Sequence, residues 1–153
     1  MPKAIHLYQQ SLAAFETIGD RAEEARILSE VAWTHLSLED PAAARRFFLD
    51  SAQAYVDVGS VRGVGTSMIG LAAVEVVEGQ PLRAVQIAAA AELFTLEEGI
   101  VNVYSEDAPG REYVERAKSE LRTADLESAT KKGRSLSVKE ALALARVAEP
   151  AVD

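Results

Sequence analysis

The sequence has no cysteine, only two histidines and one tryptophan among its 153 residues. Without cysteine, the chain forms neither disulfides nor thiolate metal sites, and a reducing cytoplasm is the compartment we expect. It also lacks a run of eighteen apolar residues, and its first ten residues lack the apolar core of a signal peptide. These absences argue against secretion and against insertion into a membrane.

Side chains that carry catalysis or bind metals are equally scarce. His6 and His35 fall in separate predicted helices, outside any HExxH or triad pattern. They do not supply the three or four ligands of a zinc site, and no Walker motif for nucleotide binding is present. Adjacent carboxylates such as Glu23 and Glu24 lie at predicted helix ends or on solvated faces. We therefore expect no catalytic residue, no metal and no cofactor.

The formal charge of −8 is unevenly distributed along the chain. Residues 1–110 contain 7 Lys and Arg against 16 Asp and Glu, whereas residues 111–153 contain 9 against 8. An acidic body repels phosphate backbones, so we expect no contact with nucleic acid from this region. The simpler interpretation is that the acidic residues only keep the protein soluble. The short basic cluster 131–134 (KKGR) suits the C-terminus of a helix.

Glycines recur at intervals of forty residues, at Gly19, Gly59 and Gly99. A repeat of this length is typical of stacked helical hairpins, in which each unit buries its apolar face against its neighbours. Other positions keep the same phase: Ala4, Ala44 and Ala84; Ser11, Ser51 and Ala91; Pro41 and Pro81; Ala32 and Ala72.

Helical spacing of apolar residues extends through most of the chain, and turn signals separate the predicted helices. Asp20 with Glu23 and Ser137 with Glu140 have the spacing of capping boxes, and Asp40 precedes a proline at the first helical position. We predict hairpin helices at 3–18, 21–38, 41–58, 61–78 and 81–98, within a region of residues 1–98. A loop at 99–109 follows, and residues 110–153 supply capping helices of the same domain at 110–123, 125–132 and 138–147.

The helix predicted at 61–78 contains three glycines, at positions 63, 65 and 70. Each costs up to about 1 kcal/mol relative to alanine inside a helix. Close approach of a neighbouring helix is the favoured explanation, and a helix start frayed as far as Gly65 is the alternative. A phosphate-binding loop is disfavoured, because the spacing is not GxGxxG and no strand precedes it.

The residues resemble tetratricopeptide-type repeats, whose second helix carries an A-x3-F pattern. Ala44 and Phe48 match this pattern, as do Ala4 and Tyr8. Ala84 matches only the alanine of the pattern. The helices that precede these carry a large and a small apolar residue in succession, Val31-Ala32 and Leu71-Ala72. The period of forty, in place of thirty-four, makes this a lengthened variant. The resemblance implies an all-α fold, a right-handed α-α superhelix of antiparallel hairpins with about seven to eight helices.

A second resemblance rests on short segments within residues 60–147: 70–72 (GLA), 79–81 (GQP), 83–84 (RA), 90–92 (AAE) and 133–145 (GRSLSVKEALALA). Together they resemble the C-terminal helical region of large bacterial regulatory ATPases of the LuxR type, related actinobacterial regulators and some cyclase-linked ATPases. Thr130 stands where that family usually has a tryptophan. The resemblance implies a non-catalytic regulatory module in a signalling or transcription-regulating protein. A free-standing adaptor and, less favoured, an enzyme on a helical scaffold are the alternatives.

In tetratricopeptide arrays the first helix of each hairpin lines a concave groove, which here predicts a site for a protein or peptide partner. Trp33 is its main candidate, because tryptophan is enriched where binding energy concentrates, although a core position is the alternative. The helix at 3–18 lacks a preceding partner, so self-association through it is a further expectation. The predicted groove residues are Arg26, Ser29, Trp33, Leu36, Thr66, Ile69, Ala73 and Val76.

Overall fold

The computed structural model describes residues 2–18, 20–100 and 108–147, and these ranges are all-helical, without strands. The five helices predicted before residue 99 are confirmed to within about one residue at each end. Residues 101–107, most of the predicted loop, and Gly19 lie outside the described ranges. The helices are α1 (Pro2–Ile18), α2 (Arg21–Ser37), α3 (Pro41–Val58), α4 (Val61–Val77), α5 (Pro81–Glu97), α6 (Arg111–Glu120), α7 (Thr123–Arg134) and α8 (Val138–Arg146).

Local capping explains why the hairpin helices begin where they do. The Asp20 carboxylate accepts a hydrogen bond from the backbone N–H of Glu23 at 3.1 Å, and Asp40 accepts from the N–H of Ala43 at the same distance. These bonds satisfy amides that would have no partner within the helix. Gly59 ends α3 with φ 74, a left-handed conformation in which glycine is not strained.

The junction of α6 and α7 differs from the prediction. α6 ends at Glu120, because Leu121 adopts an extended backbone with φ −98 and ψ 144, and α7 already begins at Thr123. α7 also continues past the predicted end at residue 132. Gly133 remains inside this helix, where its missing side chain lets α7 lie directly against α5: a Cβ would come within 2.3 Å of the Gln86 carbonyl oxygen.

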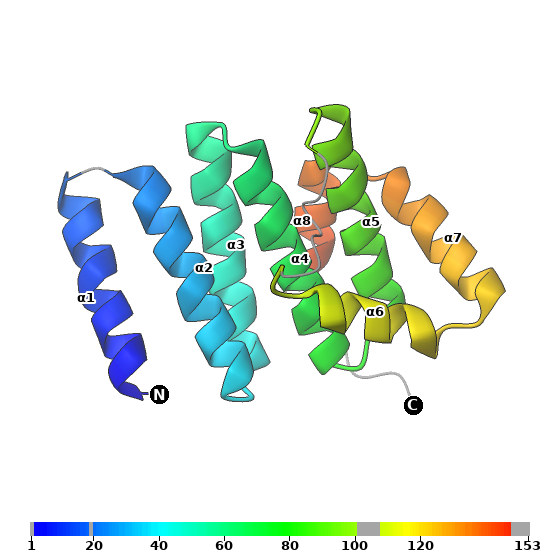
Figure 1. Ribbon diagram of the computed structural model, residues 1–153, viewed down its shortest axis with the longest axis horizontal. Coiled ribbons are helices and arrows are strands. Elements are labelled where there is room, and N and C mark those ends of the chain that lie inside the picture. The colour runs from blue at the N-terminus through cyan, green and yellow to red at the C-terminus, as the bar shows by residue number, and fades with distance from the viewer. Residues whose placement is uncertain (1, 19, 101–107, 148–153) are drawn as a thin grey trace.

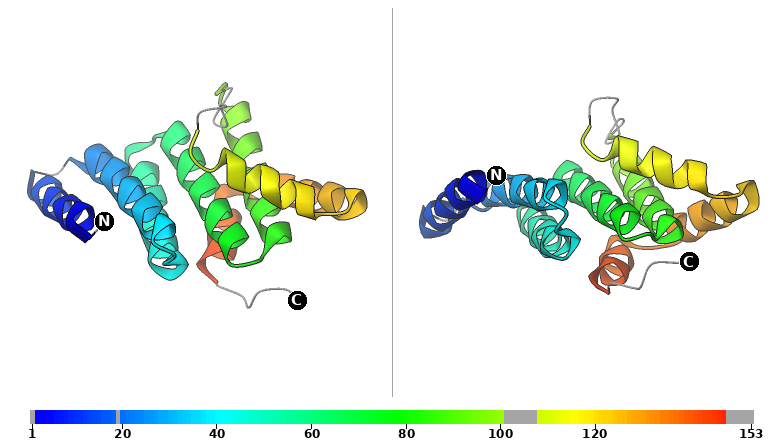
Figure 2. Two further views of the ribbon diagram at one scale, coloured as in Figure 1. Left: turned by 60° about the horizontal axis from the view of Figure 1, so that its bottom comes forward. Right: turned by 90° about the horizontal axis from the view of Figure 1, so that it is seen from below.

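Helices α1 to α5 lie side by side in chain order, and successive helices run in opposite directions (Figure 1). α7 packs against α5 at the far end of this row. α6 packs on α4 and α5, while α8 packs against α3 and α5 on the opposite face of the row (Figure 2). The segment after α5 therefore returns to cover both faces of the α3–α5 region.

The core follows the forty-residue repeat. Phe48, Leu71 and Ile87 are fully buried, as are the small repeated residues Ala44 and Ala84. Small side chains at these positions let neighbouring helices approach closely, which concentrates apolar contact between them. No helix in the described ranges is long and apolar enough to cross a membrane.

Two of the three glycines of α4 are explained by close packing. A Cβ at Gly63 would come within 2.2 Å of the Tyr55 ring, and one at Gly70 within 2.3 Å of the Phe48 ring. The prediction of close helix approach is thus confirmed. The alternative of a start frayed to Gly65 is wrong, because α4 begins at Val61 and Ser60 accepts a hydrogen bond from Gly63 N–H.

Candidate functional site

Five of the eight predicted groove residues line one cavity of about 200 Å³ between α2 and α4. Glu30, Tyr55, Ala108 and Pro109 complete the lining. The helical spacing of 26, 29 and 33 on α2, and of 66 and 69 on α4, points these side chains to a common face. The five predicted residues are Arg26, Ser29, Trp33, Thr66 and Ile69.

The other three predicted residues lie in the core. Leu36, Ala73 and Val76 are 4%, 0% and 7% exposed, so they contribute to packing and offer no surface to a partner. Ile69 lines the cavity but is only 1% exposed and belongs to the same core. Beside this part of the face, α6 packs onto α4 and α5. The accessible site is therefore shorter than predicted and lies near the middle of α2.

Trp33 is half-buried: it packs against the core and also lines the candidate binding site, the two roles considered for it. Its ring meets Phe48 of the core edge-on, with centroids 5.0 Å apart and an angle of 81°. Its other contact is Tyr113 of α6, at 6.2 Å with an angle of 34°. These aromatic contacts hold the indole in one orientation while part of it remains accessible.

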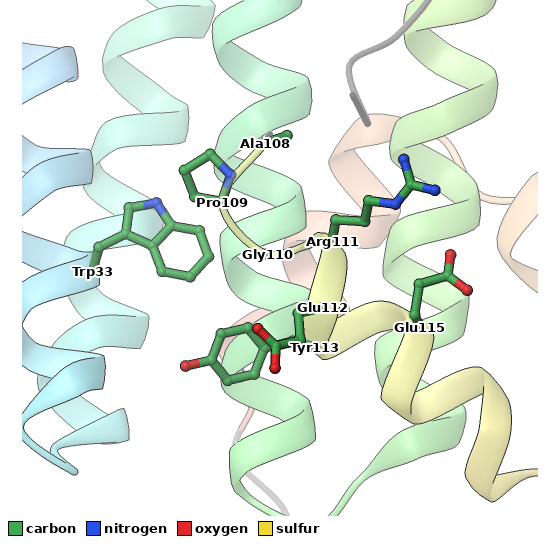
Figure 3. A pocket seen from close by; sticks show the side chains of 8 residues that line it. All are labelled: Trp33, Ala108, Pro109, Gly110, Arg111, Glu112, Tyr113 and Glu115. Atoms are coloured by element: carbon green, nitrogen blue, oxygen red, sulfur yellow. The ribbon is translucent and has the colours of Figure 1, made fainter. Parts of the chain in front are cut away.

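A second cavity, of about 480 Å³, lies beside the first and shares Trp33, Ala108 and Pro109 with it. Figure 3 shows the indole reaching from α2 toward Pro109 and Gly110, with Tyr113 and Glu112 below. Gly110 has φ 94, and a Cβ there would come within 2.7 Å of an Ile69 methyl carbon. Glycine at this position therefore allows the backbone before α6 to lie against the predicted groove face. This backbone segment divides the groove into the two cavities.

Charged groups line the smaller cavity together with its aromatic residues. The Arg26 guanidinium pairs with Glu23 at 3.0 Å and with Glu30, and its hydrogen bond with Glu23 raises the pKa of Arg26. Burial raises the pKa of the Tyr55 phenol above its ordinary value, so this group is neutral at physiological pH. The site thus offers aromatic rings, the Arg26 guanidinium and the Glu30 carboxylate to a ligand.

Among the residues that the structure describes, the histidines and carboxylates do not form a cluster of potential metal ligands. His35 stacks on Phe47 with centroids 5.2 Å apart, and its Nδ1 lies 3.5 Å from an Asp40 oxygen. His6 is exposed on α1. Within the described part of the chain, no group of three or more His, Cys, Asp or Glu residues has the arrangement of a metal site.

A buried charge cluster joins α3, α4 and α5 and was not predicted. Glu75 is 0% exposed; its carboxylate lies 2.6 Å from Arg45 Nη1 and 3.0 Å from Arg83 Nε. The same guanidinium groups donate to the last carbonyls of α8, from Arg45 to Ala145 at 2.6 Å and from Arg83 to Leu144 at 2.7 Å. One signal was available in the sequence, since Glu75 interrupts the apolar run of α4.

No protein-family model, curated protein or solved structure matches this chain in comparisons with known proteins.

Proposed function

We propose that this chain is a non-catalytic interaction module that holds a segment of a partner protein on the face around Trp33. The observation that carries the proposal is the pair of cavities that meet at Trp33 and Pro109. A preformed hollow with an aromatic floor and a few polar groups at its rim is typical of a binding site. A held, partly accessible tryptophan is also typical of the residues that dominate binding energy.

The chemistry of the two cavities favours a short peptide segment. The half-buried rings of Trp33 and Tyr55 offer apolar contact, while Arg26 and Glu30 offer charged hydrogen-bonding groups. A segment with an apolar side chain flanked by polar residues would satisfy both. Because the cavities span only part of α2 and α4, we expect dissociation constants in the range of about 1–100 µM.

A displayed library of random dodecapeptides, panned against the purified chain, tests this site. Thr66 is exposed at the rim of the smaller cavity, so Thr66→Arg fills the cavity without disturbing the core. We expect selected peptides to bind this variant at least about tenfold more weakly. Thr123→Arg is the matched control, because Thr123 is exposed at the start of α7.

Intrinsic fluorescence gives an independent readout, because Trp33 is the sole tryptophan. Binding at the proposed site shifts its emission, since a peptide over the indole removes water from it. A library that yields no peptide, or peptides that bind both arginine variants equally, would contradict the proposal.

We also propose that the row of helices forms a right-handed superhelix and that the module belongs to a bacterial regulatory ATPase. The forty-residue pattern of buried alanines supports the first point, and the resemblance in residues 60–147 supports the second. Such a module would work in the cytoplasm, and its acidic body would avoid direct contact with nucleic acid. A free-standing adaptor is the alternative. A nucleotide-binding module encoded in the same polypeptide would distinguish the regulator from it.

A further inference from the structure

One face of α1 is more exposed than the matching faces of α3 and α5, forty and eighty residues further on. Leu7 is 54% exposed, whereas Phe47 is half-buried and Ile87 is fully buried. The neighbouring positions of this face follow the same trend: in α1 they are half-buried, and in α3 and α5 they are buried. These sets are Ala4, Ala44 and Ala84; Tyr8, Phe48 and Ala88; and Ser11, Ser51 and Ala91.

In α3 the preceding helix provides contacts to this face. Phe47 stacks on His35 of α2, and the Ser51 hydroxyl donates a hydrogen bond to the Ala25 carbonyl of α2 at 2.7 Å. In the next repeat, the preceding helix α4 likewise packs against α5. Among the described helices, α1 packs substantially only on α2. Tyr8 takes part in that packing, beside Ile27, Leu28 and Val31 of α2. The side of the equivalent face of α1 that a preceding helix covers in α3 has no described helix against it. This face, made of Ala4, Leu7, Tyr8 and Ser11, is called the α1 stripe below.

The α1 stripe has the geometry of a helix-packing surface. Its positions are spaced i, i+3, i+4 and i+7, so they form one continuous line along the helix. Small residues at the two ends allow close approach, and two large residues between them supply apolar area. Residues 2–13 contain no carboxylate, although the whole chain has a charge of −8. Two copies can therefore meet at this stripe without placing carboxylates against each other.

We propose that the α1 stripe pairs with the same stripe of a second copy of this chain. Antiparallel pairing around a two-fold axis places Ala4 of each copy near Ser11 of the other, and Leu7 near Tyr8, so small residues face small ones and large face large. It also continues the alternating helix directions of the row, at whose end α1 lies (Figure 1). The acidic bodies extend away from the junction.

The pairing is weak because it buries little surface area. A single pair of 17-residue helices covers less than the roughly 800 Å² per partner of a standard specific interface. The dimer consequently forms with a dissociation constant of about 10–100 µM. It is independent of the face around Trp33, because the two surfaces lie on different helices.

Sedimentation velocity of the full 153-residue chain between about 5 and 500 µM tests this pairing. We expect a concentration-dependent shift from monomer to dimer. Leu7→Glu adds a carboxylate at the centre of the stripe and weakens dimerisation at least about tenfold. Leu96→Glu is the matched control, because Leu96 is a similarly exposed leucine (58%) near the end of α5. Circular dichroism verifies that both variants remain helical.

Cross-linking locates the contact, and the cysteine-free chain makes it unambiguous. Under mild oxidation, Leu7→Cys forms a covalent dimer much faster than Leu96→Cys at the same concentration, because the axis brings the two copies of position 7 close together. Monomers at every concentration, a dimer that Leu7→Glu leaves intact, or equal cross-linking of the two cysteine variants would each overturn the proposal.

Discussion

Glu75 is enclosed by two arginines from neighbouring helices, and these same arginines bind the end of α8. A buried ion cluster of this kind is costly to break, because removing one member leaves the others buried without compensation. The cluster thus holds the end of α8 against α3 and α5, beside the apolar packing of Ala141 and Ala145. Its contribution to stability depends on all its members being present together.

Replacing Glu75 with alanine should destabilise the fold by roughly 3–5 kcal/mol, since Arg45 and Arg83 remain buried beside a vacated site. Glu75→Gln should cost less, because its amide oxygen still accepts hydrogen bonds. Urea unfolding followed by circular dichroism measures both free energies of unfolding. Glu97→Gln, at an exposed position of α5, is the control and should have no effect. A loss below about 1 kcal/mol for the alanine variant would show that the cluster is dispensable.

At the scale of single elements, α8 illustrates how a short helix is specified locally. Ser137 accepts a hydrogen bond from the N–H of Glu140, and the Glu140 carboxylate accepts one from the N–H of Ser137, both at 3.1 Å. The sequence predicted this capping box because it requires residues only three positions apart. The end of α6 could not be predicted in the same way. Leu121 becomes extended while packed against the core, and no nearby residue signals a stop.

The backbone hydrogen bond from Ser137 lowers the pKa of Glu140 below its ordinary value of 4.5. The ionised carboxylate therefore stabilises the fold above that ordinary pKa, and this stabilisation is lost as the pH falls through the lowered pKa. We expect Glu140→Gln to lower the Tm at pH 7 and to match the parent chain at strongly acidic pH. Thermal unfolding across this pH range measures the difference. Glu127→Gln, at an exposed position of α7, should leave the Tm unchanged throughout; a pH-independent difference for Glu140→Gln would contradict the assignment.

At the scale of the whole molecule, sequence reasoning succeeded where the repeat defines the structure and failed where distant segments meet. The forty-residue phase located the first five helices and brought Arg26, Trp33 and Thr66 to one face. It gave no information on residues 110–147, which lie outside the repeat. Consequently it missed that α6 packs on α4, that Ala73 is fully buried and that Gly110 lies against Ile69.

The same arrangement predicts an uneven distribution of stability along the row. α1 packs mainly on α2, and α7 mainly on α5, whereas α3, α4 and α5 each have at least two helical neighbours. Stability in a stacked array is close to a sum over neighbouring contacts, so the end helices open locally before the centre unfolds. Amide hydrogen exchange should therefore be at least about tenfold faster in α1 and α7 than in α4.

The exchange rates of the two end helices, α1 and α7, should depend differently on protein concentration. A dimer through the α1 stripe restrains α1 and leaves α7 free to open, because only species that bind the closed form oppose its opening. Raising the concentration from about 10 to about 500 µM should thus slow exchange in α1 and leave α7 unchanged. Leu7→Glu should abolish the concentration dependence, and Leu96→Glu should retain it. Equal slowing of amide exchange in both end helices would indicate association through another surface. If α1 exchanged as slowly as α4 at low concentration, the expected nearest-neighbour dependence of stability along the row would be wrong.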